Sequence, residues 1–478
     1  MQAFDTDVAI IGAGTAGLSA YRAVMAQGKR ALLIERGPYG TTCARVGCMP
    51  SKLLIAPAEA AHAVERLPAF GLAVDGPLRV DGRAVMARVR RERDRFVGFV
   101  TDGVDMIPAA DKLRGDARFV DDRTLAVGDH TTVRAGAIVI ATGSSPVFPA
   151  PWRDLGDRVV TTDEMFEWDD LPSSAAVFGA GAISLELGQA LHRLGVRVKV
   201  CGRSGGVAPL RDPLIVAEAR RIFGAEFPLD TNARADVARV GDEVVVTHHD
   251  ADGATRVERY ACLLAATGRR PNVAGLNLEA TTLALDAAGV PRFDRATLRC
   301  GASTIFIAGD AADDMPLLHE AADEGRIAGD NAARLPDVRP SPRHAGLAIV
   351  FTDPQIAIVG GGHAAVCDSP YVTGHVSFEN QGRSRVMLQN RGRLHVYAEP
   401  ASGKFLGAEM LGPAAEHIGH LLAWARQLDL TVSEMLTLPF YHPVIEEGLR
   451  TALRDAQAKL DAGHVEPVCS APIEALMA

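Results

Sequence analysis

Val8-Ala9-Ile10-Ile11-Gly12-Ala13-Gly14-Thr15-Ala16-Gly17 opens the chain with an apolar strand that runs into a glycine-rich turn. An apolar helix is expected to continue to about Ala26, and Ala31 to Ile34 is predicted to form a second buried strand that ends in Glu35. Strand, glycine turn, helix, strand and acid in this order are the fingerprint of a dinucleotide-binding βαβ unit.

Each part of the fingerprint has a physical role. Gly12, Gly14 and Gly17 allow a tight turn and let the backbone approach a pyrophosphate, whose charge the helix N-terminus stabilises. Glu35 can accept hydrogen bonds from a ribose diol. The alternative is a glycine-rich turn that binds no ligand.

The pattern repeats in the middle of the chain. Ala176 to Phe178 lead into Gly179-Ala180-Gly181-Ala182-Ile183-Ser184, and Val196 to Cys201 form the next predicted strand. Ser184 replaces the third glycine, so the helix is expected to lie slightly further from the strand. Counting on by the spacing that joins Gly12 to Glu35 reaches Gly202, followed by Arg203, instead of an acid.

A carboxylate at that position would repel a 2′-phosphate, whereas a glycine leaves space and an arginine pairs with the phosphate. We therefore predict that the second site prefers NADPH. The alternative is that Arg203 is a solvated loop residue.

Two further segments are also duplicated. Residues 138–143 and 263–268 are apolar strands that end in small residues, and each follows a charged, β-rich stretch. The repeat indicates two copies of one nucleotide-binding architecture, the second inserted within the first. A later strand, Thr304 to Asp310, also ends in an acid, which a flavin domain would place against a ribityl hydroxyl.

Cys43 and Cys48 lie about one βαβ length after the first turn, in a stretch that continues into Pro50-Ser51-Lys52. A pair this close to a nucleotide site predicts a redox disulfide. A regular helix would separate their Cα atoms by about 8–9 Å, and a disulfide tolerates less than about 7 Å. The helix must therefore be interrupted, and Gly47 is well placed for this. The alternatives are two structural thiols or half a metal site.

The other cysteines show no such pairing. Cys201 and Cys262 lie in apolar strands and are expected in the core, and Cys469 is solitary near the C-terminus. We predict no metal site.

The composition fits a large globular protein. The chain has 478 residues, 47% hydrophobic content and a net charge of −9, so several domains are expected and nucleic acid is an unfavoured partner. No apolar run reaches the roughly 18–20 residues of a membrane span. The N-terminus shows no basic region or cleavage site, so we expect no secretory signal, no membrane association and a cytoplasmic location.

Taken together, the motifs resemble those of the flavin-dependent pyridine nucleotide–disulfide oxidoreductases, the family of dihydrolipoyl dehydrogenase, glutathione reductase and mercuric reductase. The resemblance covers nearly the whole chain and is closest in type to dihydrolipoyl dehydrogenase. The motifs that carry it are GAGTAG with Glu35, Cys43-x4-Cys48, ATG at 141–143, GAGAISLE at 179–186, ATGRRPN at 266–272, IFIAGD at 305–310 and Tyr441-His442-Pro443 with Glu446-Glu447.

The resemblance implies an α/β fold with two Rossmann-like dinucleotide-binding domains and a C-terminal α+β dimerisation domain. We place the FAD-binding domain at 1–148 and 274–345, the NAD(P)H-binding domain at 149–273 and the dimerisation domain at 346–478. A polar, arginine-rich helix is expected around Val85 to Val104, and the proline-rich stretch Leu335 to Pro342 is a predicted linker.

FAD and NAD(P)H are the implied cofactors. The predicted cofactor-binding residues are Gly12, Gly14, Gly17, Glu35, Arg36, Thr41, Thr42, Lys52, Ala117, Thr142, Gly143, Asp310, His319, Gly179, Gly181, Ile183, Glu186, Gly202, Arg203 and Gly268.

The resemblance also implies catalytic roles. Cys48 faces the flavin, and Cys43 is the outer thiol that exchanges with the substrate. Lys52, one helical turn after Cys48, stabilises the thiolate and pairs with Glu186; the alternative is an ordinary surface ion pair.

His442 is the predicted base for thiol exchange, because an imidazole titrates near neutral pH. Glu447 is expected to hold its ring, and Glu446 is the weaker choice. The resemblance implies that the partner subunit supplies His442 to the active site, which would then require a homodimer. Outside this context, a His-Pro pair would indicate only a loop.

The predicted function is electron transfer between NAD(P)H and a dithiol or disulfide, through Cys43 and Cys48, with a small disulfide or a lipoyl-carrying protein as substrate. The alternatives are an NADPH-dependent reductase of another small disulfide, a metal-ion reductase of the mercuric reductase type, or a non-enzymatic flavoprotein. The histidine favours an organic disulfide, because mercuric reductases generally lack it.

Several positions depart from the family pattern. Gly40-Thr41-Thr42 stands where paired glycines usually precede the threonine, Cys43-Ala44-Arg45 replaces the commoner Cys-Leu-Asn or Cys-Val-Asn, and Val444 replaces a threonine. These departures leave the substrate open.

Overall fold

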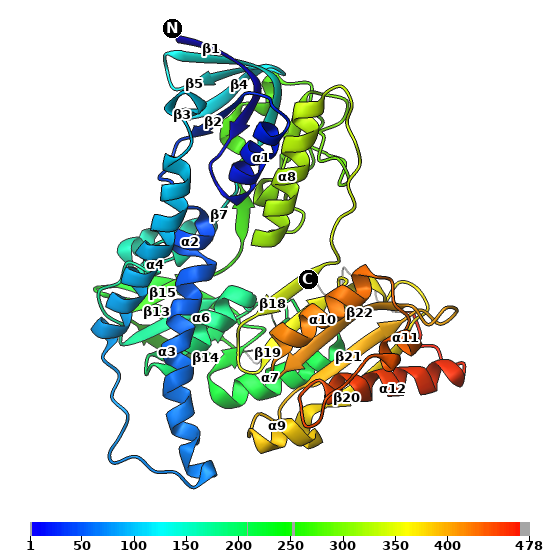
Figure 1. Cartoon of the computed structure of the whole chain (residues 1–478). Coiled ribbons are helices and arrows are strands. Elements are labelled where there is room, and N and C mark those ends of the chain that lie inside the picture. Colours follow the sequence, from blue (N-terminus) through cyan, green and yellow to red (C-terminus); the bar gives the residue numbers. More distant parts are fainter. Residues whose placement is uncertain (1, 208, 251–253, 469–478) are drawn as a thin grey trace.

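The computed structural model describes residues 2–207, 209–250 and 254–468 and shows an elongated molecule with three sheet-centred regions (Figure 1). Two regions contain parallel sheets of the Rossmann type, and the third is an antiparallel sheet with helices. The predicted fold class is confirmed. The exact domain boundaries stay predictions.

The first sheet runs in the order β3 (Lys112–Arg114), β2 (Ala31–Glu35), β1 (Gln2–Ile11), β6 (Thr131–Ile140), β5 (Thr124–Val127) and β4 (Ala117–Asp121), and β17 (Ile305–Ile307) also pairs with β6. The strands β1, β2, β3, β6 and β17 are mutually parallel. Alternate residues of β1 enter opposite core layers, Val8 and Ile10 on one side and Ala9 and Ile11 on the other. Burial on both faces explains why this strand is apolar throughout its second half.

Helices α1 (Thr15–Ala26) and α8 (Leu318–Arg334) cover one face of this sheet and lie side by side (Figure 1). Their approach requires glycine on α8. A Cβ atom at Gly325 would lie 2.1 Å from the carbonyl oxygen of Ala16, and one at Gly329 would lie 2.5 Å from that of Ala20.

The second sheet is parallel, in the order β11 (Leu229–Asp230), β10 (Arg197–Cys201), β9 (Ser174–Phe178), β15 (Cys262–Ala265) and β8 (Val159–Val160). Its helices are α6 (Ala182–Arg193), α7 (Pro213–Glu226) and the short α5 (Thr162–Met165), and a small antiparallel sheet is formed by β12 (Ala235–Val240), β13 (Glu243–His249) and β14 (Thr255–Tyr260). The two chain crossings that connect this region to the first, β7 (Ser144–Pro146) and β16 (Arg269–Pro271), pair with each other.

The two parallel regions repeat the same backbone contact. A Cβ atom at Gly12 would lie 2.3 Å from the oxygen of Ala141, and one at Gly179 would lie 2.2 Å from the oxygen of Ala266. Both glycines have positive φ, +108° and +122°. The glycine turn and the strand that ends in Ala-Thr-Gly therefore meet in the same way twice, as the sequence repeat predicts.

The C-terminal sheet is antiparallel, in the order β18 (Leu347–Val350), β19 (Gln355–Val359), β22 (Phe405–Gly412), β21 (Arg393–Ala398) and β20 (Val372–Ser377). It carries helices α9 (Gly382–Val386), α10 (Ala415–Gln427), α11 (Val432–Thr437) and α12 (Glu447–Asp461). This region lies at the lower right of Figure 1, away from the first sheet.

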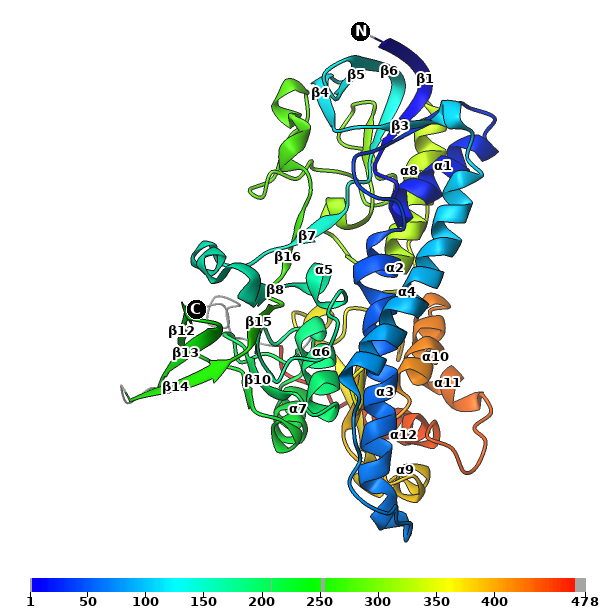
Figure 2. The same cartoon turned by 90° about the vertical axis from the view of Figure 1, so that its left-hand side faces the viewer.

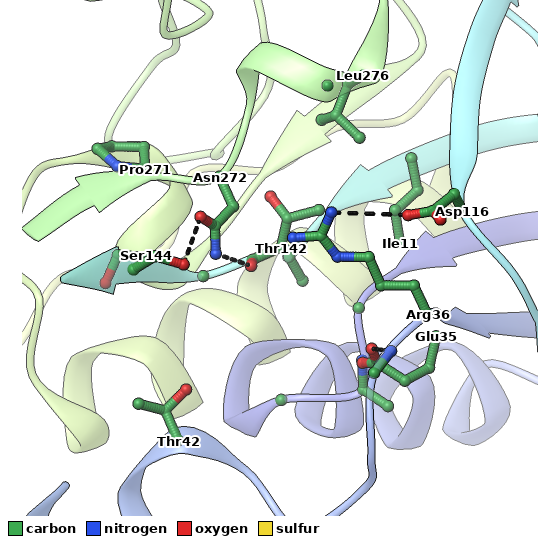
Figure 3. A pocket seen from close by; sticks show the side chains of 18 of the residues that line it. Ile11, Glu35, Arg36, Thr42, Asp116, Thr142, Ser144, Pro271, Asn272 and Leu276 are labelled. Atoms are coloured by element: carbon green, nitrogen blue, oxygen red, sulfur yellow. Dashed lines mark hydrogen bonds and ion pairs between the residues drawn. The ribbon is translucent and has the colours of Figure 1, made fainter. Parts of the chain in front are cut away.

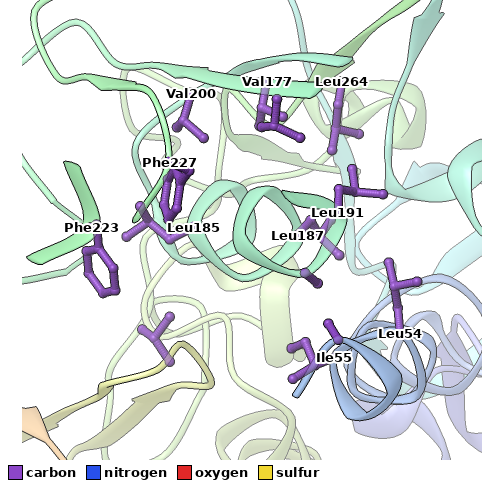
Figure 4. Packing of buried hydrophobic residues seen from close by; sticks show 14 of the residues in the cluster. Leu54, Ile55, Val177, Leu185, Leu187, Leu191, Val200, Phe223, Phe227 and Leu264 are labelled. Carbon is purple, nitrogen blue, oxygen red and sulfur yellow. The ribbon is translucent and has the colours of Figure 1, made fainter. Parts of the chain in front are cut away.

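Two long helices, α3 (Cys48–Arg66) and α4 (Gly82–Asp105), run alongside the parallel regions (Figure 2). The arginine-rich α4 confirms the predicted helix. Leu54 and Ile55 of α3 belong to the same buried cluster as Leu187 and Leu191 of α6 (Figure 4), so the helix that begins at Cys48 packs on the second nucleotide-binding region.

Cys201 and Cys262 are buried, as expected, whereas Cys469 lies outside the described residues. Within the described ranges, no helix is long and apolar enough to cross a membrane. The same ranges contain no group of three or more metal-ligating side chains of the kind that could hold an ion.

Replacing Gly329 by alanine is expected to force α8 away from α1 and to lower the free energy of unfolding by about 1–3 kcal/mol, the usual cost of overpacking. Urea denaturation followed by circular dichroism measures the change. Gly98→Ala in α4 is the matched control, because a Cβ atom there meets nothing within 4 Å. The control is expected to leave stability unchanged or to raise it by up to about 1 kcal/mol; equal losses in both variants would contradict the close-packing explanation.

Candidate active site

The two cysteines lie on either side of a helix break. Cys43 belongs to α2 (Thr42–Val46), and Cys48 is the first residue of α3. Gly47, with φ −126° and ψ −117°, separates the two helices. The predicted interruption is confirmed, and it lets the two side chains meet.

Both cysteines are free thiols in this structure, Cys43 half-buried and Cys48 exposed. A hydrogen bond with Cys48, together with burial, raises the pKa of Cys43 well above its usual range. The hydrogen bond from Cys43 and the positive charge of Lys52 lower the pKa of Cys48 to about 7, against partial burial. The pair therefore holds its negative charge on Cys48 and its proton on Cys43.

Lys52 connects the cysteine helix to the second nucleotide-binding region. Its Nζ lies 2.8 Å from Oε2 of Glu186 on α6 and 4.4 Å from the ring centre of Phe351. Glu186 is buried, and its other oxygen accepts a hydrogen bond of 2.8 Å from the backbone N–H of Phe351. The implied ion pair is thus present and mostly shielded, unlike an ordinary surface pair. Its role beside a flavin stays a prediction.

A cavity of about 520 Å³ extends from the first glycine turn to α2, and we call it the nucleotide cavity. Nine of the predicted cofactor-binding residues line it: Gly12, Gly14, Glu35, Arg36, Thr41, Thr42, Ala117, Thr142 and Gly143. Arg36 forms an ion pair with Asp116 at 3.6 Å, and Asn272 donates to the carbonyl oxygen of Thr142 (Figure 3).

Other predicted residues lie outside the lining of this cavity. Gly17 is a packing position, since a Cβ there would lie 1.8 Å from the oxygen of Gly12. Asp310 accepts a 2.7 Å hydrogen bond from the hydroxyl of Ser144, and the half-exposed His319 lies beside Glu320. Lys52 and Glu186 pair with each other outside this lining.

The cavity also contains residues that our prediction missed: Arg45, Asp116, Ser144, Ser145, Asp163, Arg269, Arg270, Asn272 and Leu276. Arg269 and Asn272 belong to the ATGRRPN motif, which could have indicated them. Asp116 and Asp163 carry no motif of their own, because the fold brings their segments to the cavity.

Thr41 has a backbone conformation that is rare for its residue type. Its φ of +58° with ψ of 152° lies in a region that is essentially reserved for glycine. Its hydroxyl accepts a hydrogen bond of 3.3 Å from the N–H of Ala44 and so caps α2. The departure from paired glycines therefore keeps the glycine-like backbone and adds a cap to the cysteine helix.

At the second glycine turn, a Cβ at Gly181 would meet nothing within 4 Å, which leaves its backbone accessible. Ile183 is an exposed apolar side chain at the start of α6, and Gly268 has φ +123°. Arg203 is exposed in the loop after β10. These placements fit a second nucleotide site, and their roles stay predictions.

The reason for glycine at position 202 differs from the one expected. A Cβ there would lie 2.6 Å from the Cβ of Ala180 and 3.2 Å from the oxygen of Thr231. Close packing of the turn excludes a side chain, so Gly202 does not by itself leave space for a 2′-phosphate. The NADPH prediction therefore depends on Arg203.

His442 lies in the C-terminal region, with Nδ1 3.0 Å from Oε1 of Glu447 at the start of α12. The hydrogen bond with His442 lowers the pKa of Glu447, which favours its charged form. The imidazole is 81% exposed. Within one chain this region is remote from α2 (Figures 1 and 2), so the structure does not bring His442 to Cys43 of the same chain.

Two family models match the chain. Residues 6–325 match the pyridine nucleotide-disulphide oxidoreductase model, and residues 347–453 match the dimerisation domain of the same family. The chain belongs to the pyridine nucleotide-disulphide oxidoreductases. Members of this family use FAD and NAD(P)H, and the second match supports a homodimer.

The family relatives carry different names. The chain is 33% identical to a mercuric reductase of Shigella flexneri, over 93% of this chain and 80% of that protein. It is 30% identical to dihydrolipoyl dehydrogenase 3 of Pseudomonas aeruginosa, over 95% and 98% of the two chains.

Among solved structures, LpdA of Mycobacterium tuberculosis superposes with a TM-score of 0.78 at 25% identity, over 94% of this chain and 99% of LpdA. The flavoprotein disulfide reductase RclA of Escherichia coli, solved as a Cu(II) complex, shares the fold with a TM-score of 0.78 at 22% identity, over 95% and 99%.

The nucleotide cavity fits the FAD of this family. A Cβ at Gly14 would meet nothing within 4 Å, so the backbone at the start of α1 is open to a pyrophosphate. The buried hydroxyl of Thr142 has no hydrogen-bond partner among the described residues, and it lies in the cavity lining, where a bound cofactor could supply one.

Replacing Lys52 by methionine is expected to raise the pKa of Cys48 by roughly one unit or more from about 7, because a nearby cation stabilises the thiolate. The rate of iodoacetamide alkylation of Cys48 in the reduced apoprotein, measured against pH by mass spectrometry, reports this pKa. Lys404→Met is the control, since Lys404 pairs with Asp429 elsewhere on the surface. An unchanged midpoint in the Lys52 variant would show that its charge does not act on Cys48.

Proposed function

We propose that this protein transfers electrons between NAD(P)H and a small disulfide or dithiol, in the manner of a dihydrolipoyl dehydrogenase. The observation that carries the proposal is the pair of hydrogen-bonded thiols beside α2, whose residues Thr42 and Arg45 line the nucleotide cavity. The hydrogen bond from Cys43 and the charge of Lys52 favour the thiolate of Cys48, whereas the charge of Glu186 opposes it. A lipoyl group, free or on a carrier protein, is the proposed substrate class.

Bound FAD supplies the route for two electrons from NAD(P)H to the Cys43–Cys48 disulfide. Once reduced, Cys48 holds the thiolate beside Lys52, and Cys43 keeps its proton. The Cys43 sulfur attacks one substrate sulfur as its proton is removed, and a mixed disulfide forms while the second substrate sulfur leaves. Cys48 then attacks Cys43, which restores the disulfide and releases the first substrate thiolate.

The raised pKa of Cys43 means that this sulfur needs a base before it can attack. His442 is the proposed base, and its bond to Glu447 fixes one ring nitrogen and leaves the other to exchange protons. Since His442 lies far from Cys43 within the chain, the partner subunit of the homodimer is the proposed source. In the reverse direction, in which a dithiol is oxidised, Cys43 takes the proton back from His442.

Metal-ion reduction is a second candidate, because relatives 32–33% identical to this chain are named mercuric reductases. Two close thiols can bind a soft metal ion. The His442–Glu447 pair favours the organic disulfide, because a proton-transfer group serves thiol exchange directly.

Steady-state turnover of the FAD-loaded protein tests the proposal, with NADH and NADPH in parallel against lipoamide, glutathione disulfide and mercuric ion. We expect reduction of a disulfide, with NADPH preferred, and loss of this activity in Cys43→Ser while FAD stays bound. Turnover of mercuric ion alone would support the second candidate, and no turnover with FAD bound would support a non-enzymatic role. Equal rates with both nucleotides would contradict the role of Arg203.

Mixed dimers test the shared active site. Cys43→Ser and His442→Ala chains, each inactive as a homodimer, are co-expressed with different tags, and the mixed dimer is purified. If His442 acts across the interface, one of the two sites is intact, and about half of the wild-type activity is expected. If His442 acts within its own chain, the mixed dimer has no intact site, and its inactivity would contradict the proposal.

A further inference from the structure

Arg45 lies between the two cysteines, at a position where the family commonly has asparagine. It is half-buried on α2 and lines the nucleotide cavity. Its guanidinium makes no hydrogen bond or ion pair with any residue that the structure describes. Two other arginines of the cavity do have partners, since Arg36 pairs with Asp116 and Arg269 donates to Ser144. Arg270 also lines the cavity but is exposed.

The methylene groups of Arg45 pack in a defined place beside Gly40. A Cβ atom at Gly40 would lie 3.0 Å from Cδ and 3.1 Å from Cγ of Arg45, and 2.9 Å from a methyl of Val97. Gly40 also has φ +121°, which side chains rarely adopt. The missing side chain at Gly40 therefore makes room for the methylene groups of Arg45 and limits where its guanidinium can go.

The charge of Arg45 acts on a carboxyl group of the cavity lining. Burial raises the pKa of Asp163, a carboxyl group that also lines the cavity, and the charges of Arg269 and Arg45 oppose this rise. The charges that act on Cys48 are those of Lys52 and Glu186. Arg45 thus lies within electrostatic reach of Asp163, whose helix α5 packs beside α2 at the cavity.

We propose that Arg45 binds the pyrophosphate of FAD. The pyrophosphate is the part of FAD with formal negative charge, and the open glycine turn at the start of α1 lines the same cavity as Arg45. A planar, positively charged guanidinium can donate two hydrogen bonds to two phosphate oxygens at once. Asparagine, which is common at this position in the family, is neutral and cannot form such a charged pair. The inference depends on FAD as the cofactor and not on the identity of the disulfide substrate.

The contact would attach the cofactor to the helix that carries Cys43. Thr41 caps this helix and Cys43 lies in its first turn, so one five-residue element would hold both the outer thiol and a pyrophosphate ligand. Gly40, Thr41 and Arg45 are then parts of one local arrangement, which accounts for neighbouring departures from the family pattern.

The rate at which the loaded protein releases FAD tests the proposal. The rise in fluorescence of the freed FAD measures this rate, at low and at high salt. Arg45→Asn, which installs the residue common in the family, is expected to speed release by about 10- to 100-fold at low salt, the usual effect of losing a charge-assisted hydrogen bond. The effect should shrink at high salt. Arg45→Lys keeps the charge and is expected to restore part of the retention.

Arg22→Asn is the matched control, because Arg22 is exposed on α1 and does not line the cavity. It should release FAD at the wild-type rate. The reduction potential of bound FAD, measured by dye equilibration, should be unchanged in Arg45→Asn, since the pyrophosphate is not the redox-active part.

Unchanged release in Arg45→Asn would overturn the proposal. So would equal release from the lysine and asparagine variants, which would indicate a packing role, or a shifted potential without faster release, which would place Arg45 at the flavin ring. None of these outcomes requires substrate turnover, so failure here is distinct from failure of the proposed function.

Discussion

Glu186 joins the three regions of the chain beside the two cysteines, and the geometry of the candidate active site depends on it. It lies on α6 of the second nucleotide-binding region, binds Lys52 of α3 through one oxygen and accepts from the backbone of Phe351, at the start of the C-terminal region, through the other. A buried carboxylate is costly unless it is fully paired. Removing Lys52 would leave the charge of Glu186 without its counter-charge, and the two contacts together hold the three regions in one arrangement.

This contact fixes the position of α3, the helix that begins at Cys48. Leu54 and Ile55 anchor α3 on α6 by apolar packing, while Lys52, one turn from Cys48, adds the directional ion pair. The start of α3 is therefore held in place, and the break at Gly47 lets it meet Cys43 of α2, the helix whose residues Thr42 and Arg45 line the nucleotide cavity. Position and local backbone geometry together make two-electron sulfur chemistry possible there.

The two sulfurs are chemically unequal for the same reason. The charge of Lys52 acts on Cys48, and the Cys43 thiol donates a hydrogen bond to the Cys48 sulfur, so the pKa of Cys48 is lowered and that of Cys43 is raised. Such a division suits an inner thiolate that exchanges electrons with a cofactor and an outer thiol that waits for a base. The exposed His442–Glu447 pair is a suitable base only if a second chain brings it to Cys43.

The sequence by itself determined the elements that depend on local spacing: both glycine turns, the strands that flank them, the acid at Glu35, the helix break near Gly47 and the arginine-rich α4. These features follow from the geometry of the backbone within a few residues, so their residues can be found without knowing what surrounds them. Motif order along the chain was also enough for the fold class and for nine lining residues of the nucleotide cavity.

Only the tertiary structure decided the rest, because contacts between distant segments set it. It showed that Gly202 is required by packing against Ala180, that Thr41 keeps a glycine-like backbone, and that Asp116 and Asp163 reach the cavity. It also showed that the guanidinium of Arg45, in the lining of the nucleotide cavity, has no hydrogen-bond or ion-pair partner among the described residues. Spacing along a chain does not reveal which side chains lack partners, because partners come from segments that only the fold brings together.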